Sequence, residues 1–115
     1  MLNQNKGTLL ADRAGIANTS AKRRTGLLKH ASLERGDGLW IAPCEGVHTF
    51  GMKFPIDVLF LNKKKQVLKI RPDMVKGRIS FSLRAHSVLE LPAGMAAETG
   101  TTAGDQLEFQ KYEAD

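Results

Sequence analysis

The stretch FPIDVLFLNKKKQVLKIR, residues 54–71, shows most directly how this chain folds. Five of the six residues from Ile56 to Leu61 are apolar, and several are branched or aromatic, which predicts a strand covered on both faces. The polar run NKKKQ predicts a turn, and the alternating VLKIR at 67–71 predicts a second strand. The two strands are therefore expected to pair as a hairpin.

Shorter elements are predicted on both sides of this hairpin. Four further strands are expected at 8–10, 39–41, 87–92 and about 105–110, the last with Leu107 and Phe109 facing inward. Two small helices are expected within 18–33 and 93–100, the first capped by Thr19 or Ser20 and the second ended by Gly100. Short connections between such strands indicate an α+β fold, mainly antiparallel β, arranged as a compact curled sheet or small barrel-like domain.

The totals indicate one ordered domain over residues 1–115. The apolar fraction is 42% and the charged fraction 25%, so neither a disordered chain nor a fibre is expected. A single cysteine cannot form an internal disulfide, which fits a reducing compartment. No apolar run approaches the roughly 18 residues of a membrane span, and the first residues lack an export signal. We therefore expect a soluble, cytoplasmic protein with no membrane partner.

Charge is distributed unevenly along the chain. Residues 1–86 hold 16 Lys and Arg against 6 Asp and Glu, a net charge of +10, whereas residues 87–115 hold 1 against 6, a net charge of −5. Such asymmetry marks either a face that binds polyanions or two segments that neutralise each other in the fold. Aromatic residues are only 6%, so platforms for stacking bases are few and nucleic-acid binding would be weak.

The stretch PCEGVHTFGM, residues 43–52, contains the only cysteine and one of three histidines. In an extended strand the spacing of Cys44 and His48 separates them by about 13 Å, so they meet only if the chain folds back at Glu45–Gly46. His48 could then deprotonate Cys44, with Asp57 orienting the imidazole, or all three could hold a divalent metal. In the alternative, Cys44 is a small buried apolar group and His48 bonds a backbone carbonyl.

Asp57 is a lone acid in an apolar strand, on the same face as Leu59 by alternation. A carboxylate in such a place costs several kcal/mol unless it is paired or hydrogen-bonded. Amides of the preceding corner, Thr49, Lys53, His48 or an arginine could supply the partner. Asp57 therefore either fastens the corner or lines a pocket, with Thr49 and Lys53 as ligand-binding candidates beside it.

Glu90, in the run VLELP, is a second acid inside a predicted strand. If this strand lies beside the strand of Asp57, the two carboxylates could converge for acid–base chemistry or cation binding. A charge in the middle of a strand otherwise faces solvent. Glu90 is therefore a further ligand-binding candidate.

Four stretches taken in order resemble the small prokaryotic family named domain of unknown function 192: TGLL, DGLWIAPCEGVHTFGMKFPIDVLFLNKKKQVLKI, VLELPAG and GDQLEF. The resemblance covers about residues 20–110 and implies a compact, largely β single domain, without an established activity. Many members have GLMFR where this chain has residues 26–30, and WMKNT at 48–52. The chain is similar to a branch with a Pro-Cys…His-Thr corner. Five positions match the family pattern: Asp57, Glu90, Gly94, Gly104 and Asp105.

Three hypotheses for function follow. The first is a non-enzymatic binding or accessory module that binds a small ligand or a protein at a ligand-facing corner, residues 43–57. The second is an enzyme with a Cys44/His48/Asp57 site, working through the thiol or by metal-assisted hydrolysis. The third is a weak binder of polyanions or nucleic acid. No cofactor is expected, although a divalent metal at Cys44, His48 and Asp57 would fit the second hypothesis.

Overall fold

The structure is a computed structural model that describes residues 1–25 and 32–109. In chain order the elements are β1 (Leu2–Asn3), β2 (Thr8–Leu9), β3 (Arg13–Ala17), α1 (Ser20–Thr25), β4 (Asp37–Ile41), β5 (Gly46–His48), β6 (Ile56–Leu61), β7 (Val67–Met74), β8 (Ile79–Phe81), β9 (Ser87–Pro92), α2 (Met95–Glu98) and β10 (Leu107–Glu108).

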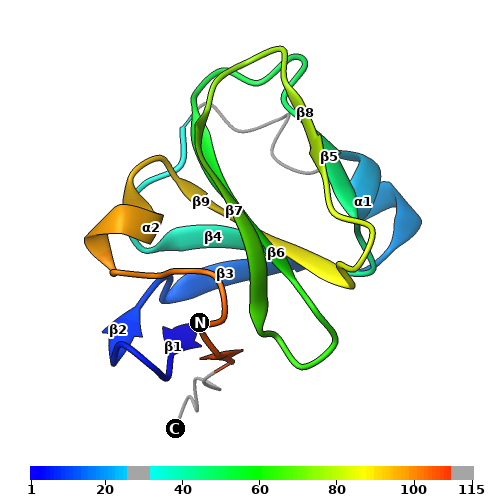
Figure 1. Cartoon of the computed structure of the whole chain (residues 1–115). Helices are drawn as coiled ribbons and strands as arrows, with labels where there is room; N and C mark the ends of the chain where they lie inside the picture. The colour runs from blue at the N-terminus through cyan, green and yellow to red at the C-terminus, as the bar shows by residue number, and fades with distance from the viewer. Residues whose placement is uncertain (26–31, 110–115) are drawn as a thin grey trace, which may run out of the picture.

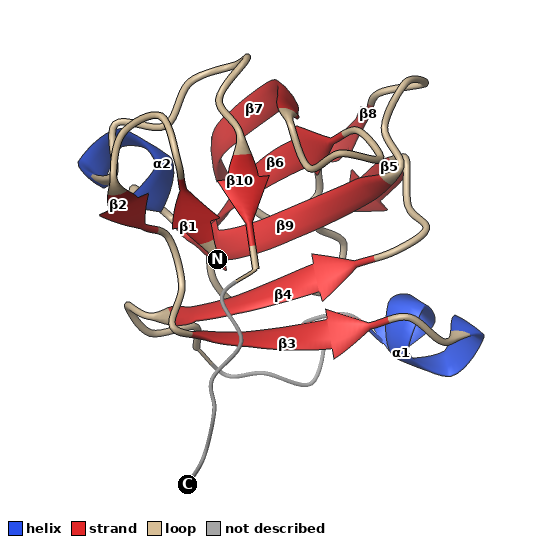
Figure 2. Ribbon diagram, turned by 90° about the horizontal axis from the view of Figure 1, so that it is seen from below, coloured by secondary structure: helices blue, strands red, loops and turns tan. Residues whose placement is uncertain are grey.

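The strands form three sheets among the described residues (Figure 1). The largest has the order β3-β4-β9-β6-β7, in which β3 and β4 run parallel and every other pair is antiparallel. A small sheet of order β10-β1-β2 and a two-stranded β5–β8 ribbon complete the fold. The ribbon lies at the opposite end of the molecule from β2 and α2 (Figures 1 and 2).

The predicted central hairpin is confirmed. Every residue of β6 is buried, as its apolar run requires, and β6 pairs antiparallel with β7. The side chain of Asn62 closes the turn by accepting hydrogen bonds from the amides of Lys64 and Gln66, each at 2.9 Å. Lys65 adopts a φ of 63° there, a left-handed conformation that such turns need.

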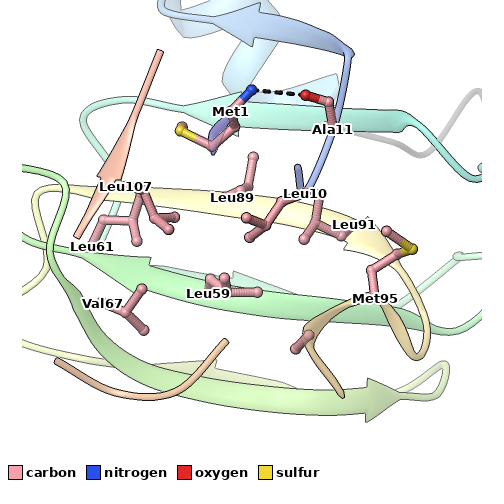
Figure 3. Close-up of a cluster of buried hydrophobic side chains, with 11 residues drawn as sticks. Met1, Leu10, Ala11, Leu59, Leu61, Val67, Leu89, Leu91, Met95 and Leu107 are labelled. Atoms are coloured by element: carbon pink, nitrogen blue, oxygen red, sulfur yellow. Dashed lines mark hydrogen bonds between the residues drawn. The ribbon is translucent and has the colours of Figure 1, made fainter. Parts of the chain in front are cut away.

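Two apolar clusters fill the two faces of the large sheet. The first core lies between the sheet and the β1, β10 and α2 region, and it contains Met1, Leu10, Ala11, Leu59, Leu61, Val67, Leu89, Leu91, Met95, Ala96 and Leu107 (Figure 3). The second core lies on the opposite face and contains Met52, Ile56, Val58, Phe60, Met74 and Val88. Val47 of β5 packs against the second core, so the ribbon covers this face.

The fold prediction is confirmed in its main part: mostly antiparallel sheets with two short helices. The barrel-like part is not confirmed, because β3 and β7 remain edges of the large sheet among the described strands. Thr19 caps α1 by accepting a hydrogen bond from the amide of Lys22 at 3.2 Å, and Gly100 has a φ of 70°. The rest of the first predicted helix lies mostly outside the described residues.

Other predictions differ from the structure. Phe109 was expected inward but is 36% exposed, because it lies beyond the end of the short β10. The edge of its ring packs against Trp40, with the two ring centroids 5.0 Å apart. Four strands were not predicted: β1, β3, β5 and β8. Within the described residues, no helix has the length and apolar content that a membrane crossing requires.

Candidate functional site: the 43–57 corner and the β5–β8 ribbon

Asp57 is fully buried and fastens two distant segments to β6. Its Oδ1 accepts a hydrogen bond from the amide of Asp73 at 2.8 Å, and its Oδ2 accepts one from the amide of Ala96, also at 2.8 Å. Ala96 lies in the first turn of α2, and Asp73 has a φ of 49° near the end of β7. The carboxylate thus holds α2 and a distorted part of β7 in place, and its partners are not the corner residues that the sequence suggested.

Cys44 and His48 lie in different environments from Asp57 and from each other. Cys44 is half-buried, packs against the second core, and donates its thiol to the carbonyl of Gly46 at 3.1 Å. Asp57 bonds α2 on the side of the first core, so the large sheet separates it from Cys44. His48 points outward and stacks on Phe50, with ring centroids 5.4 Å apart.

The chain therefore does not bring the three residues into one site. Residues 46–48 form the extended strand β5, so the fold-back at Glu45–Gly46 that would join Cys44 to His48 does not occur. Among the residues described, no three His, Cys, Asp or Glu side chains lie together in a group that could hold a metal ion.

Thr49 and Lys53 also have defined places. Thr49 is fully buried, and its Oγ1 donates to the carbonyl of Val75 at 2.6 Å and accepts from the amide of Arg78 at 2.8 Å. The backbone of Thr49 accepts a further hydrogen bond from Gly77 at 3.2 Å. Thr49 consequently joins the end of β5 to the β7–β8 turn, whereas Lys53 is exposed.

Glu90 is buried on the face opposite to Asp57. The strands of the two acids are neighbours, which is the condition on which convergence depended. However, β9 pairs Leu91 with Asp57 and Glu90 with Val58, so the two carboxylates do not converge. Glu90 is 5% exposed and has no hydrogen bond from a described residue. Burial raises the pKa of this carboxyl to about 7.

The outward face of the β5–β8 ribbon carries most of the exposed apolar side chains of this region. Gly46 pairs with Phe81, and His48 pairs with Ile79. Phe50, in the turn after β5, stacks on His48, and Leu83 lies in the turn after β8. We call this surface the ribbon face, made of Gly46, His48, Phe50, Ile79, Phe81 and Leu83. Its large apolar members are between 50% and 78% exposed.

Sequence reasoning missed the ribbon face, although a signal was present. The run ISFSL at 79–83 alternates apolar and polar residues, which indicates a strand. Because apolar side chains of a strand usually face the core, this pattern would turn Ile79 and Phe81 inward. Instead Ser80 is buried, and its hydroxyl has no hydrogen-bond partner among the described residues.

Positive charge surrounds the ribbon face. Arg78 and Arg84 adjoin its apolar residues in sequence, and Lys69 donates its Nζ to the carbonyl of Phe81 at 3.0 Å. The four ion pairs of the described chain are Lys6–Asp105, Arg13–Asp12, Arg13–Asp37 and Arg35–Glu98. None of these neutralises the cations of the ribbon, although Lys6 and Arg35 do join the basic part of the chain to the acidic part.

Comparison with known proteins identifies the family. The family model of DUF192, described as an uncharacterized ACR, matches residues 1–109. The chain belongs to the DUF192 family. No curated protein matches it.

Two solved structures share the fold of this DUF192 chain. One is a protein of unknown function from Novosphingobium aromaticivorans, with a TM-score of 0.76 and 24% identity, covering 84% of this chain and 74% of that one. The other, from Sinorhizobium meliloti, carries the name "putative transcription regulator", with a TM-score of 0.77 and 24% identity, covering 83% and 79%. At these identities the likeness shows the fold alone.

Proposed function

We propose that this protein is a non-enzymatic binding or accessory module that docks a partner on the ribbon face. The 43–57 corner contributes His48 and Phe50 to that face, and β8 contributes Ile79 and Phe81. The observation that carries the proposal is the exposure of four large apolar side chains along a two-stranded ribbon and the turns that follow its strands, at 50%, 59%, 62% and 78%. Contiguous exposed apolar surface of this kind marks interaction sites.

Covering these side chains with a partner would release free energy. Full burial of a Leu, Ile or Phe side chain contributes about 1.5 to 3 kcal/mol, so each of these half-exposed side chains would contribute about 1 kcal/mol or more when covered. Four such contributions, about 4 kcal/mol or more in total, would supply the apolar part of a contact. Polar and charged groups must supply the rest, because association itself costs about 4 to 15 kcal/mol. The separate environments of Cys44, His48 and Asp57 give no comparable support to a thiol-based or metal-assisted hydrolase.

Site-specific photo-cross-linking in the native cells tests this proposal. A photoreactive phenylalanine analogue placed at Phe81 or Leu83 is expected to give an adduct with a partner. The control position is Leu9 of β2, which is 46% exposed and lies at the other end of the molecule. No adduct at Phe81 or Leu83, or equal adducts at Leu9, would remove the ribbon face as a docking surface for a protein partner.

A further inference from the structure

The ribbon face combines projecting apolar side chains with positive charge. Leu83, in the turn after β8, is 78% exposed, and Phe50, in the turn after β5, is 50% exposed. Ile79 and Phe81 lie between them at 62% and 59%. The apolar stripe therefore runs along the whole ribbon and ends in a turn on each side.

Six cations lie on or next to the segments that frame this stripe: Lys53, Lys69, Arg71, Lys76, Arg78 and Arg84. None forms an ion pair with any residue in the described part of the chain. Only two exposed acids, Glu45 and Asp73, occur in the same segments. The surroundings of the stripe are thus strongly positive, and a partner of complementary charge must be anionic.

Internal contacts hold the ribbon face in this orientation. On its inner side Val47 packs against the second core and Ser80 is buried. At one end the amide of Ser82 donates to the carbonyl of Glu45 at 2.8 Å, and at the other end Thr49 bonds the β7–β8 turn. The apolar residues are therefore presented outward by a packed element.

We infer that the partner of the ribbon face is an anionic lipid surface, an inference that rests on the proposed function. Apolar side chains that enter the headgroup region, surrounded by Lys and Arg that contact lipid phosphates, are the combination used by peripheral membrane-binding elements. Arg78 precedes Ile79 and Arg84 follows Leu83 in sequence, and Lys69 donates to the carbonyl of Phe81, so cations adjoin the stripe at both ends and at Phe81, which suits a plane of headgroups. The expectation of no membrane partner came from the lack of a spanning segment, and a peripheral contact needs none.

A nucleic acid fits the ribbon face less well. Single-stranded nucleic acids bind through aromatic rings on which the bases stack. The two most exposed apolar residues, Leu83 and Ile79, are aliphatic and offer no ring for stacking. An acidic protein segment would share the charge complementarity, and the experiment below separates it from lipid.

Vesicle co-sedimentation of the full chain tests the inference. The probes are vesicles of phosphatidylcholine alone and vesicles of equal parts phosphatidylcholine and phosphatidylglycerol. We expect binding to the anionic vesicles only, weakening as salt is raised. Leu83→Ser should reduce the partition coefficient about tenfold, because a largely exposed Leu no longer enters the membrane. Arg84→Glu should reduce it about thirtyfold, because two unit charges change near the surface.

Matched variants separate specific effects from general ones. Arg84→Lys keeps the charge and should bind like the wild type. Leu9→Ser removes a leucine side chain of β2 that is 46% exposed and should also leave binding unchanged. Circular dichroism of each variant checks that it is folded. Equal binding to both kinds of vesicle, or equal losses in Leu83→Ser and Leu9→Ser, would overturn the inference.

The outcomes also distinguish this inference from the proposed function. Cross-linking of Phe81 to a protein, without vesicle binding, would overturn the lipid partner and leave the docking surface intact. Retardation of a single-stranded oligonucleotide that Arg84→Glu abolishes, again without vesicle binding, would assign the face to nucleic acid and overturn the lipid partner. Absence of both vesicle binding and cross-linking would remove both proposals.

Discussion

Glu90→Gln is expected to make this protein more stable near neutral pH. Glu90 is a carboxyl on the central strand β9, 5% exposed, with Leu39 and Val58 as its cross-strand neighbours. Burial raises the pKa of Glu90 from 4.5 to about 7 in the folded protein. Because the neutral acid is favoured in the fold, ionising it costs stability, and glutamine keeps the shape without the charge.

The sign and size of the effect follow from proton linkage. Below pH 4.5 the carboxyl is protonated in both the folded and the unfolded protein, so it has no pH-dependent effect. Between pH 4.5 and about 7 only the folded state keeps the proton, so the free energy of unfolding falls as pH rises. A difference of about 2.5 in pKa corresponds to about 3 kcal/mol, and this full cost is present above pH 7.

Urea unfolding across this pH range provides the assay. The free energy of unfolding is measured for Glu90→Gln and for the wild type below pH 4.5 and above pH 7. Relative to the wild type, the variant should gain about 3 kcal/mol between the lower and the higher pH. Glu45→Gln, which changes an exposed carboxyl, is the matched control. A constant difference for Glu90→Gln would refute the reasoning, because it would mean that folding does not change the pKa of this carboxyl.

Three further expectations concern the corner and its contacts. Asp57→Asn should lower the free energy of unfolding by about 1 to 3 kcal/mol in urea titrations, because one amide donor then faces the Asn NH₂; an unchanged urea midpoint would contradict the buried contact. Thr49→Val should cost about 1 to 3 kcal/mol while Thr49→Ser keeps both Oγ hydrogen bonds, and equal stabilities of the two variants would argue against that role. Cys44 should react with a thiol reagent more slowly in the folded protein than in urea, and His48→Ala should leave the native rate unchanged; a slower rate in that variant would instead support the thiol-based hypothesis.

The elements best predicted from the sequence are those whose burial has a local signature. The predicted strands 56–61 and 87–92 coincide with β6 and β9, because dense apolar runs between turn residues have few alternatives in a small domain. The cap at Thr19 and the positive φ of Gly100 follow from side-chain chemistry within a few residues. Strand β3 lacks such a signal, since its run RAGIA is half exposed and pairs with β4 at a distance in sequence.

The two acids show where local reasoning ends. The sequence indicated that Asp57 needs hydrogen-bond donors, and the structure supplies them from residues 16 and 39 positions away. No local pattern identifies those amides. For Glu90, the sequence established neither which strand lies beside its own nor the register of that pairing. A shift of one residue decides whether its carboxyl shares a face with Asp57 or lies on the other side of the sheet.

The ribbon face is the part of the fold in which apolar side chains of a strand do not face the core. Alternation in ISFSL would bury Ile79 and Phe81, yet β8 buries Ser80 and leaves its hydroxyl without a partner among the described residues. A slip of one residue would reverse this arrangement and bury the apolar side chains. The hydrogen bonds of Thr49 with Arg78 and of Glu45 with Ser82 hold the opposite register. Specific polar contacts at both ends of the ribbon therefore keep its apolar face exposed. A docking surface requires such contacts, whereas an incompletely packed core would not produce them.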